Sequence, residues 1–381
     1  MKISADKKIL LEAIVPAASF TSNKETVAVV EGILLRTVDD KTVDICAYDL
    51  EKGFKTTIGC IVEEEGCYAI SSGRFVQIIK SMPDGLIRIE VNPKNLRVTV
   101  TAGRSKMEMS ALSGDKFPDF PDFRGDRGFN IRKKDLRVII GRTMFAIGQN
   151  NPRPELNGLF LKVENGELSA VSCDGNRLAV YTEKCTLENV NEGELSFGVI
   201  IPFRMIQELT KFASDTDDKM RVAIARKHII FFIDNFIIFT RMIDYEYIDY
   251  NRFIPKAPKI FCELETAALT SSLERAMFIT EDRQQRELKP AAICTFTGDT
   301  LSVYAYSIIG KVNDEIPMIH DGEDLEIGFN CRFLYEAMKA CDEEKVKLSL
   351  TSPLMGMTIE PVMKSDGKKL TLLVLPVRLN K

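Results

Sequence analysis

The chain has few of the residues on which metal sites and many enzymes rely. Among its 381 residues there is no tryptophan, and the only two histidines, His228 and His320, lie far apart. Nine cysteines are scattered along the chain, and none forms a Cys-x-x-Cys pair. Structural zinc sites and histidine-based catalysis need such residues in clusters. The sequence therefore argues against both kinds of site and leaves carboxylate chemistry open.

Long apolar segments and nucleotide-binding motifs are also missing. No run of about 18 apolar residues is present, so we expect no membrane-spanning helix. Residues Met1–Asp6 lack the apolar segment of a signal peptide, and we expect a cytoplasmic protein with reduced thiols. The sequence contains no phosphate-binding loop, dinucleotide fingerprint or zinc motif, so we expect no cofactor.

What the chain does contain is an internal repeat. Leu156–Val180 has the pattern of an apolar strand, a tight Asn-Gly turn, a second strand and a polar corner at Asp174–Arg177. Similar pairs of strands begin near Gly32 and Ala292. Gly32 and Gly158 are 126 positions apart. This recurrence predicts three copies of one unit of about 125 residues.

Each copy has the pattern of a helix, a hairpin, a second helix and three strands, and 45% hydrophobic residues are ample for folded cores. The predicted helices are Ala5–Ser19, Arg74–Ser81, Ile131–Gly148, Pro202–Ala213, Glu263–Ile279 and Asn330–Cys341. We therefore predict an α+β fold of three domains, with boundaries at 1–123, 124–255 and 256–381.

The predicted helices are the basic part of an acidic chain. They hold 14 lysines and arginines and 8 acidic residues, a net charge of +6, whereas the whole chain carries −4. Each second helix opens with an arginine, at Arg74, Arg204 and Arg332. The basic residues of any single helix can be explained as an ordinary solvent-exposed face. Recurrence in three copies instead favours a surface that holds a polyanion by its phosphates.

Two acidic residues recur at equivalent corners and could be taken for a catalytic pair. Asp49 and Asp174 each follow the second strand of a hairpin. Acidic residues commonly cap the backbone N–H groups of such turns. Because the two lie in different copies of the repeat, we interpret them as turn caps, and an enzyme becomes the weaker interpretation.

Four short motifs, in order along the whole chain, resemble those of one protein family. They are Phe117–Pro121, Asp174–Ala179, Ile327–Asn330 and Leu375–Leu379. Together they resemble the bacterial DNA polymerase III beta subunits, the sliding clamps. The sequence departs from that family's common pattern at Ile248, where proline is frequent, and at Asn176, where histidine is frequent.

The resemblance implies three repeated clamp domains and a head-to-tail homodimer that closes as a ring around duplex DNA. Helices would line the hole and antiparallel sheets would form the outside. Such a non-catalytic ring tethers the replicative polymerase and other replication and repair proteins, and so confers processivity. The alternative is a repeat-built protein-interaction scaffold that does not enclose DNA.

The resemblance also implies three sets of site residues. The expected contacts to DNA phosphates are Lys24, Arg74, Lys80, Arg132, Lys133, Arg137, Arg142, Arg204, Lys211, Arg332 and Lys339. The expected pocket for short linear motifs of the polymerase alpha subunit, the clamp loader and other partners is formed by Arg153, Leu156, Cys173, Gly175, Asn176, Arg177, Leu178, Ile248, Arg252, Phe253, Asn330, Phe333, Leu354, Gly356, Leu373, Val374, Leu375, Pro376, Val377, Arg378 and Leu379. At the dimer interface we expect Met107, Met109, Phe278 and Ile279, for which packing within one domain is an equal alternative.

Overall fold

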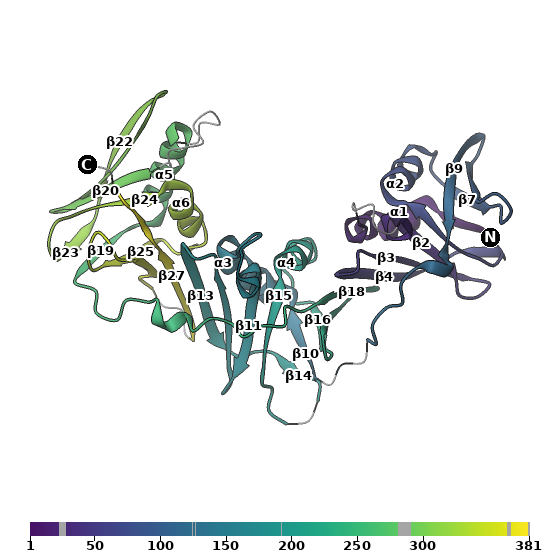
Figure 1. Ribbon diagram of the computed structural model, residues 1–381, viewed down its shortest axis with the longest axis horizontal. Helices are drawn as coiled ribbons and strands as arrows, with labels where there is room; N and C mark the ends of the chain where they lie inside the picture. The colour runs from purple at the N-terminus through teal and green to yellow at the C-terminus, as the bar shows by residue number, and fades with distance from the viewer. Residues whose placement is uncertain are drawn as a thin grey trace. The chain divides into compact units, whose positions relative to one another are not determined.

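The computed structural model describes residues 1–22, 28–123, 125, 127–191, 193–280, 291–363 and 367–379 (Figure 1). The predicted DNA contact Lys24 lies outside this part of the chain.

The elements recur three times in the same order. The first copy comprises β1 (Lys2–Asp6), α1 (Lys7–Ala17), β2 (Gly32–Thr37), β3 (Thr42–Tyr48), β4 (Lys52–Gly59), β5 (Ile61–Glu64), β6 (Cys67–Ser71), α2 (Ser72–Ser81), β7 (Leu86–Val91), β8 (Arg97–Ala102) and β9 (Ser105–Ser113). The second comprises β10 (Arg127–Arg132), α3 (Lys133–Thr143), β11 (Gly158–Glu164), β12 (Glu167–Cys173), β13 (Arg177–Lys184), β14 (Glu188–Asn189), β15 (Phe197–Pro202), α4 (Phe203–Leu209), β16 (Lys219–Ile224), β17 (His228–Ile233) and β18 (Phe236–Arg241). The third comprises β19 (Ile260–Glu265), α5 (Thr266–Thr280), β20 (Ala291–Thr297), β21 (Thr300–Ser307), β22 (Gly310–Pro317), β23 (Ile319–Asp321), β24 (Leu325–Asn330), α6 (Cys331–Lys339), β25 (Lys345–Leu350), β26 (Met357–Pro361), β27 (Lys368–Val374) and the short β28 (Pro376–Val377).

The first helix of each copy begins later than predicted, because a strand precedes it. Residues assigned to the helices Ala5–Ser19, Ile131–Gly148 and Glu263–Ile279 include the ends of β1, β10 and β19. These short strands pair with β7, β16 and β25, which lie far along the chain. Their conformation therefore depends on distant partners, which helical spacing does not reveal.

The central hairpin has the predicted form. In β11–β12, Glu164 pairs with Glu167 around Asn165 and Gly166, whose φ angles are 51° and 72°. Two positive φ angles are characteristic of the type I′ turn that Asn-Gly favours. Strand alternation is also confirmed in β7, where Ile87 and Ile89 are fully buried. These local features follow directly from the sequence.

Contacts divide the chain into two compact units. The first contains residues 1–133, 187–192 and 216–242, and the second contains 134–186, 193–215 and 243–381. The first unit holds a 14-stranded sheet, and the second holds sheets of nine and five strands. Residues of the predicted central domain occur in both units, so its exact boundaries stay a prediction.

Helices cover one face of the sheets in each unit (Figure 1). In the first unit α1 and α2 pack together, with α1 on β3 and β4 and α2 on β6. In the second unit α5 and α6 pack side by side, and α4 packs on β11 and β15. Each helix thus buries one apolar stripe and leaves its other face to carry polar side chains.

Neighbouring copies join through equivalent strands. β4 of the first copy pairs with β18 of the second, and β13 of the second pairs with β27 of the third. The equivalent strand of the third copy is β22, which pairs with β21 alone among the described residues. The equivalent of β18 and β27 in the first copy is β9, whose residues 105–110 pair with β8 alone in the described part of the chain.

Candidate functional site: the corner after β12 and the basic helices

The corner between β12 and β13 is held by one carboxylate. Asp174 Oδ1 accepts hydrogen bonds from the backbone nitrogens of Asn176 at 2.8 Å and Arg177 at 3.1 Å. Gly175 between them has a φ of +95°, which glycine adopts without strain. Asp49 caps the equivalent corner of the first copy, accepting from the backbone nitrogen of Lys52 at 2.7 Å. The interpretation of both aspartates as turn caps is confirmed.

Arg177 anchors this corner to α6. Its side chain is 9% exposed, and its Nε donates to Asp174 Oδ2 at 3.0 Å while Nη1 donates to Glu336 Oε2. Its guanidinium carbon lies 4.4 Å from the ring centre of Phe333 and 5.2 Å from that of Phe145. The charge is thus paired and enclosed by two aromatic rings. Arg177 shapes the corner through these partners.

An apolar cluster lies beside the corner and brings together several predicted pocket residues. Leu156, Cys173, Leu178 and Leu373 are buried in it, and Ile248 packs against it. Burial raises the pKa of the Cys173 thiol, while the nearby positive charge of Arg153 acts in the opposite direction. The cluster therefore places one wall of the predicted pocket next to a basic side chain.

Two aromatic residues of the cluster were not predicted as site residues. The Tyr247 ring stacks on Phe160 with 4.7 Å between ring centres, and Tyr250 also packs on the cluster. Burial raises the pKa of Tyr247. The aromatic run of residues 244–258 was the signal in the sequence, because aromatic side chains in a connecting segment need an apolar surface to cover them.

Several predicted pocket residues outside the cluster are exposed apolar side chains or exposed polar and basic ones. Phe253 is 54% exposed, Leu354 77% and Leu375 40%. Arg153, Arg252, Arg378 and Asn176 are exposed as well. The backbone nitrogen of Leu375 donates to Asn176 O at 2.8 Å, which joins the C-terminal segment to the corner. Exposed apolar groups and arginines are the side-chain types suited to a peptide with apolar anchors.

The remaining predicted pocket residues lie on neighbouring elements. Asn330 caps α6, accepting from the backbone nitrogen of Phe333 at 3.2 Å. The backbone at Gly356 lies close to the Leu373 side chain of β27, because a Cβ on Gly356 would lie 2.7 Å from Leu373 Cδ1. The C-terminal residues have mixed positions: Val374 is buried opposite Arg177, Pro376 and Val377 pair with β24, and Leu379 packs over Gly328.

The predicted DNA contacts differ in how far they are already paired. Arg74, Lys80, Arg137, Arg204, Lys211, Arg332 and Lys339 are exposed. Lys211 contacts Glu208 at 2.5 Å, and Arg137 lies 3.8 Å from Asp215. Arg132 belongs to β10 rather than to a helix and lies 3.7 Å from Asp217.

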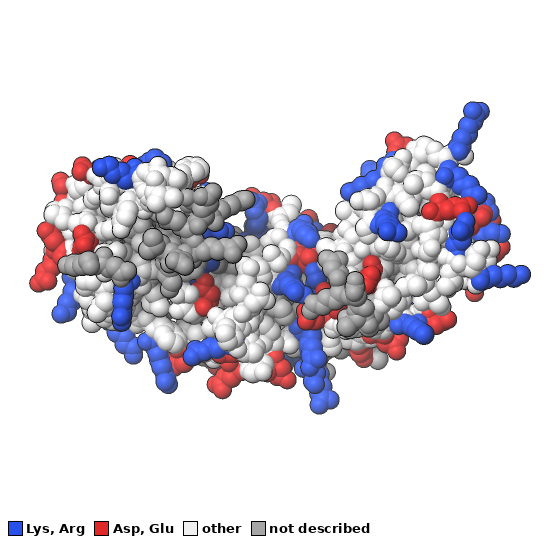
Figure 2. Space-filling view, turned by 45° about the horizontal axis from the view of Figure 1, so that its top comes forward, with Lys and Arg blue, Asp and Glu red and all other residues white. Residues whose placement is uncertain are grey.

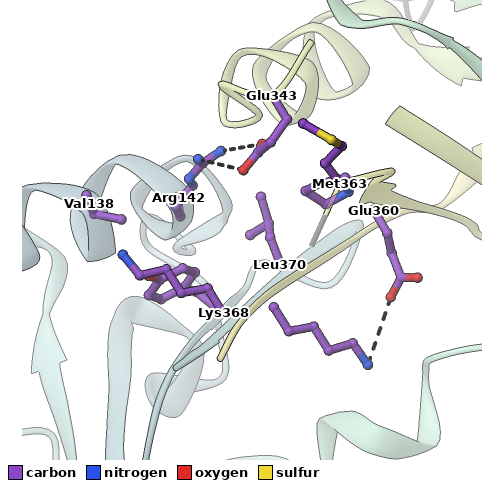
Figure 3. A pocket seen from close by; sticks show the side chains of 10 residues that line it. Val138, Arg142, Glu343, Glu360, Met363, Lys368 and Leu370 are labelled. Atoms are coloured by element: carbon purple, nitrogen blue, oxygen red, sulfur yellow. Dashed lines mark hydrogen bonds and ion pairs between the residues drawn. The ribbon is translucent and has the colours of Figure 1, made fainter. Parts of the chain in front are cut away.

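Lys133 and Arg142 are largely buried in ion pairs. The Lys133 side chain is 10% exposed and lies 3.0 Å from Asp234 Oδ2. The Arg142 side chain is 12% exposed and contacts both oxygens of Glu343 at 3.0 and 3.1 Å (Figure 3). Of the predicted DNA contacts described in the structure, these two are the least able to reach a phosphate.

A small cavity of about 160 Å³ lies next to Arg142, between α3 and the β26–β27 hairpin (Figure 3). Its lining residues are Val138, Arg142, Tyr181, Glu343, Glu360, Pro361, Met363, Lys368, Lys369 and Leu370. None of them was predicted for the peptide pocket, so the cavity is distinct from the predicted pocket.

The residues predicted at a dimer interface are partly open to solvent. Met107 on β9 is 41% exposed and Phe278 near the end of α5 is 74% exposed, whereas Met109 and Ile279 are half-buried. Large exposed apolar side chains at these positions leave room for a partner.

Two classes of feature are not found in the described part of the chain. None of its helices is long and apolar enough to cross a membrane. No group of three or more His, Cys, Asp or Glu side chains among the described residues is arranged to hold a metal ion.

Comparisons with known proteins connect the repeat to one family. Three models of that family match in order: the DNA polymerase III beta subunit N-terminal domain over residues 1–121, the central domain over 130–249 and the C-terminal domain over 251–378. A beta sliding clamp from Halalkalibacterium halodurans is 26% identical, covering 95% of this chain and 96% of that protein. The Escherichia coli K12 beta sliding clamp is 25% identical over the full length of both.

Solved structures agree with the sequence comparisons. The crystal structure of a putative DNA polymerase III beta subunit from Eubacterium rectale superposes with a TM-score of 0.89 at 25% identity, and each chain is fully covered. The Bacillus subtilis DNA polymerase sliding clamp gives a TM-score of 0.89 at 23% identity, again with full coverage, and shows the same fold. Three copies of one unit, each matched by its own domain of a single family, leave one conclusion: the chain belongs to the DNA polymerase III beta subunit family.

Proposed function

We propose that the chain is a DNA sliding clamp, a non-catalytic ring that encircles duplex DNA and confers processivity on the polymerase that it tethers. The observation that carries the proposal is the match of three successive clamp-domain models to three copies of one structural unit. The domain boundaries 1–123, 124–255 and 256–381 and a location in the cytoplasm are part of the same proposal.

The charge of the helices supports a role in holding DNA. With the helix bounds of the structure, α1 to α6 contain 12 lysines and arginines and 5 acidic residues, a net charge of +7. The whole chain carries −4, so the remaining residues sum to −11. Acidic and basic side chains are interspersed on the face that Figure 2 presents. A modest positive charge on the helices would attract DNA phosphates weakly, and topological enclosure would provide the retention.

The pairing of equivalent strands supports a head-to-tail dimer. Each copy contributes one strand to the next, β4 to β18 and β13 to β27. Continuing this pattern, β22 of one protomer would pair with residues 105–110 of β9 in its partner. That pairing would cover two strand edges that otherwise invite aggregation. It would also bring Met107 and Met109 toward Phe278 and Ile279 of the partner.

The surface beside Asp174 would be the docking site for short linear motifs. The buried cluster of Leu156, Cys173, Leu178 and Leu373 would form its floor, and the exposed side chains of Arg153, Arg252 and Arg378 would form its rim. The DNA polymerase III alpha subunit, the clamp loader and other polymerases and repair proteins would compete for this site. Arginines at an apolar groove can bind the carbonyl and carboxylate groups of a peptide.

Retention on circular DNA tests the proposal. The purified protein is loaded on a nicked circular plasmid by a clamp loader and separated by gel filtration, before and after the plasmid is cut once. A ring stays on the circle at moderate salt and leaves the linear form. A repeat-built interaction scaffold would ignore the cut, and an ordinary DNA-binding protein would be released by salt irrespective of topology. Either of these outcomes refutes the proposal.

A further inference from the structure

A chain of four alternating charges connects the corner to the exposed face of α6. Arg177 binds Asp174 through Nε at 3.0 Å and Glu336 Oε2 through Nη1. The second oxygen of Glu336, Oε1, accepts from Nε of Arg332 at 2.9 Å. One carboxylate, which was not predicted as a site residue, therefore joins the corner beside the predicted peptide pocket to an expected DNA contact.

Exposure changes along this chain of charges. The side chain of Arg177 is 9% exposed, that of Glu336 27% and that of Arg332 61%. A phosphate can therefore compete with Glu336 for Arg332, whereas Arg177 is enclosed between Phe145 and Phe333. An ion pair at the exposed end is weak and easily exchanged, and one at the buried end is held more firmly.

We propose that Glu336 couples DNA binding to peptide binding, an inference that rests on the proposed clamp function. In the absence of DNA, Glu336 divides its negative charge between Arg332 and Arg177. When a phosphate binds Arg332, the Arg332–Glu336 ion pair is broken and Glu336 keeps its ion pair with Arg177. The ion pair between Glu336 and Arg177 then strengthens, because a second cation no longer competes for the same carboxylate.

The strengthened pair acts on the corner and, through it, on the C-terminal segment. Arg177 holds Asp174, and Asp174 holds the backbone of the corner through the nitrogens of Asn176 and Arg177. The carbonyl of Asn176 in turn holds Leu375 of the C-terminal segment. A better ordered corner loses less conformational entropy when a peptide binds. DNA therefore raises the affinity for the peptide, and by linkage the peptide raises the affinity for DNA by the same factor.

The probe is a fluorescein-labelled peptide that carries the clamp-binding motif of a DNA polymerase III alpha subunit. Its affinity for the full-length protein is measured by anisotropy at low salt, with and without a short linear duplex. We expect the duplex to tighten wild-type peptide binding by about two- to fivefold, the lower end of typical coupling between sites. Without DNA, Arg332→Ala is expected to bind the peptide about two- to fivefold more tightly than wild type does. Adding the duplex is expected to cause no further increase in the peptide affinity of this variant.

Two further variants separate coupling from loss of charge. Glu336→Gln removes the shared charge and is expected to bind the peptide more weakly and without response to the duplex. Lys339→Ala removes a cation from the same helix, and we expect weaker DNA binding with the DNA-dependent gain retained. The inference is overturned if Arg332→Ala has wild-type peptide affinity, or if Glu336→Gln responds to DNA as wild type does.

The outcome for the coupling is distinct from that for the clamp. If wild-type protein is retained on nicked circles but its peptide affinity ignores DNA, the clamp function stands and the coupling fails. If the protein is not retained, the clamp function fails. A tighter peptide complex of Arg332→Ala without DNA still reports the link through Glu336 in that case.

Discussion

Single residues at the junction of β4 and β18 show how tightly neighbouring copies are packed. A Cβ on Gly53 would lie 2.2 Å from Cζ of Phe239, and the Phe239 ring is itself packed against Tyr48 and Phe120. The ring occupies the space above Gly53 and has aromatic neighbours that restrict its movement. Only glycine fits below it, for reasons of space rather than of backbone conformation.

We expect Gly53→Ala to lower the free energy of unfolding by about 1–3 kcal/mol, since the added methyl group must displace a buried ring. Gly59→Ala in the same strand is the matched control, because a Cβ there has nothing within 4 Å, and a change within about 0.5 kcal/mol is expected. Urea denaturation measures both. Equal effects of the two substitutions would contradict the packing argument.

Buried thiols predict a loss of stability in alkali. Burial raises the pKa of Cys294 from 9.0 to about 12. Below pH 9 the thiol is protonated in both the folded and the unfolded chain and has no effect. As the pH rises above 9, the unfolded chain loses this proton first, and the free energy of unfolding falls by up to about 1.4 kcal/mol per pH unit until the folded pKa is reached.

The measurement compares urea denaturation of wild type and Cys294→Ala from about pH 8 to pH 10.5. We expect a shallower decline in the variant, whatever its stability at pH 8, because one thiol that ionises on unfolding is gone. Parallel curves would show that Cys294 does not ionise preferentially in the unfolded chain.

At the scale of elements, α3 carries two arginines that differ in burial and in partners. Arg142 lies at its C-terminal end and binds Glu343 and the carbonyl of Ala340, so it connects α3 to the end of α6. Arg137 lies on the same helix with a side chain that is 60% exposed. The helix therefore supplies one residue for internal packing and another for solvent or a ligand.

Substitution of the two arginines should separate stability from DNA binding. Arg142→Ala leaves Glu343 without its bidentate partner and is expected to cost about 3 kcal/mol of stability, the lower end for a buried pair, because the Glu343 side chain is 24% exposed. Arg137→Ala is expected to change stability by no more than about 0.5 kcal/mol and to reduce the salt dependence of DNA binding. Denaturation curves and DNA titrations at several salt concentrations test both. The assignment would be contradicted if Arg137→Ala lowered stability while Arg142→Ala changed only the salt dependence of DNA binding.

At the scale of the whole molecule, the threefold repeat predicts how protomers assemble. Two junctions between copies are made within the chain by equivalent strand pairs. The third pair would join the edge strand β22 to residues 105–110 of β9, which pair with β8 alone in the described part of the chain. The exposed Phe278 and Met107 lie on the two copies that this third junction would join. A closed ring is the arrangement in which every junction is satisfied.

Phe278→Asp is expected to convert the dimer to monomer at micromolar concentration, because a carboxylate would be buried without a partner. Ile319→Asp is the control, because Ile319 is 69% exposed, similar to Phe278 at 74%. Ile319 lies on β23, at the edge of the nine-stranded sheet, whereas the proposed interface involves β22 of the five-stranded sheet. Sedimentation velocity distinguishes the species. A dimeric Phe278→Asp, or a monomeric wild type, would refute the proposed interface.

The sequence by itself determined the repeat, through similar patterns such as those at Gly32 and Gly158, 126 positions apart. It also determined the central hairpin and the capped corners, because these turns depend on residues close together in the chain. Asn165 and Gly166 specify a turn, and Asp174 caps nitrogens two and three residues later. The chemistry of such features is local, so it is visible in the order of residues alone.

Tertiary structure alone decided which charges are internal and which strands begin each copy. Lys133 pairs with Asp234 and Arg142 with Glu343, partners 101 and 201 positions away. The strands β1, β10 and β19 pair with strands 80 to 97 positions away. Glu336 gains its role from two arginines on different elements. The energies of buried ion pairs and of strand pairing depend on distances and solvent exclusion that only the folded chain sets.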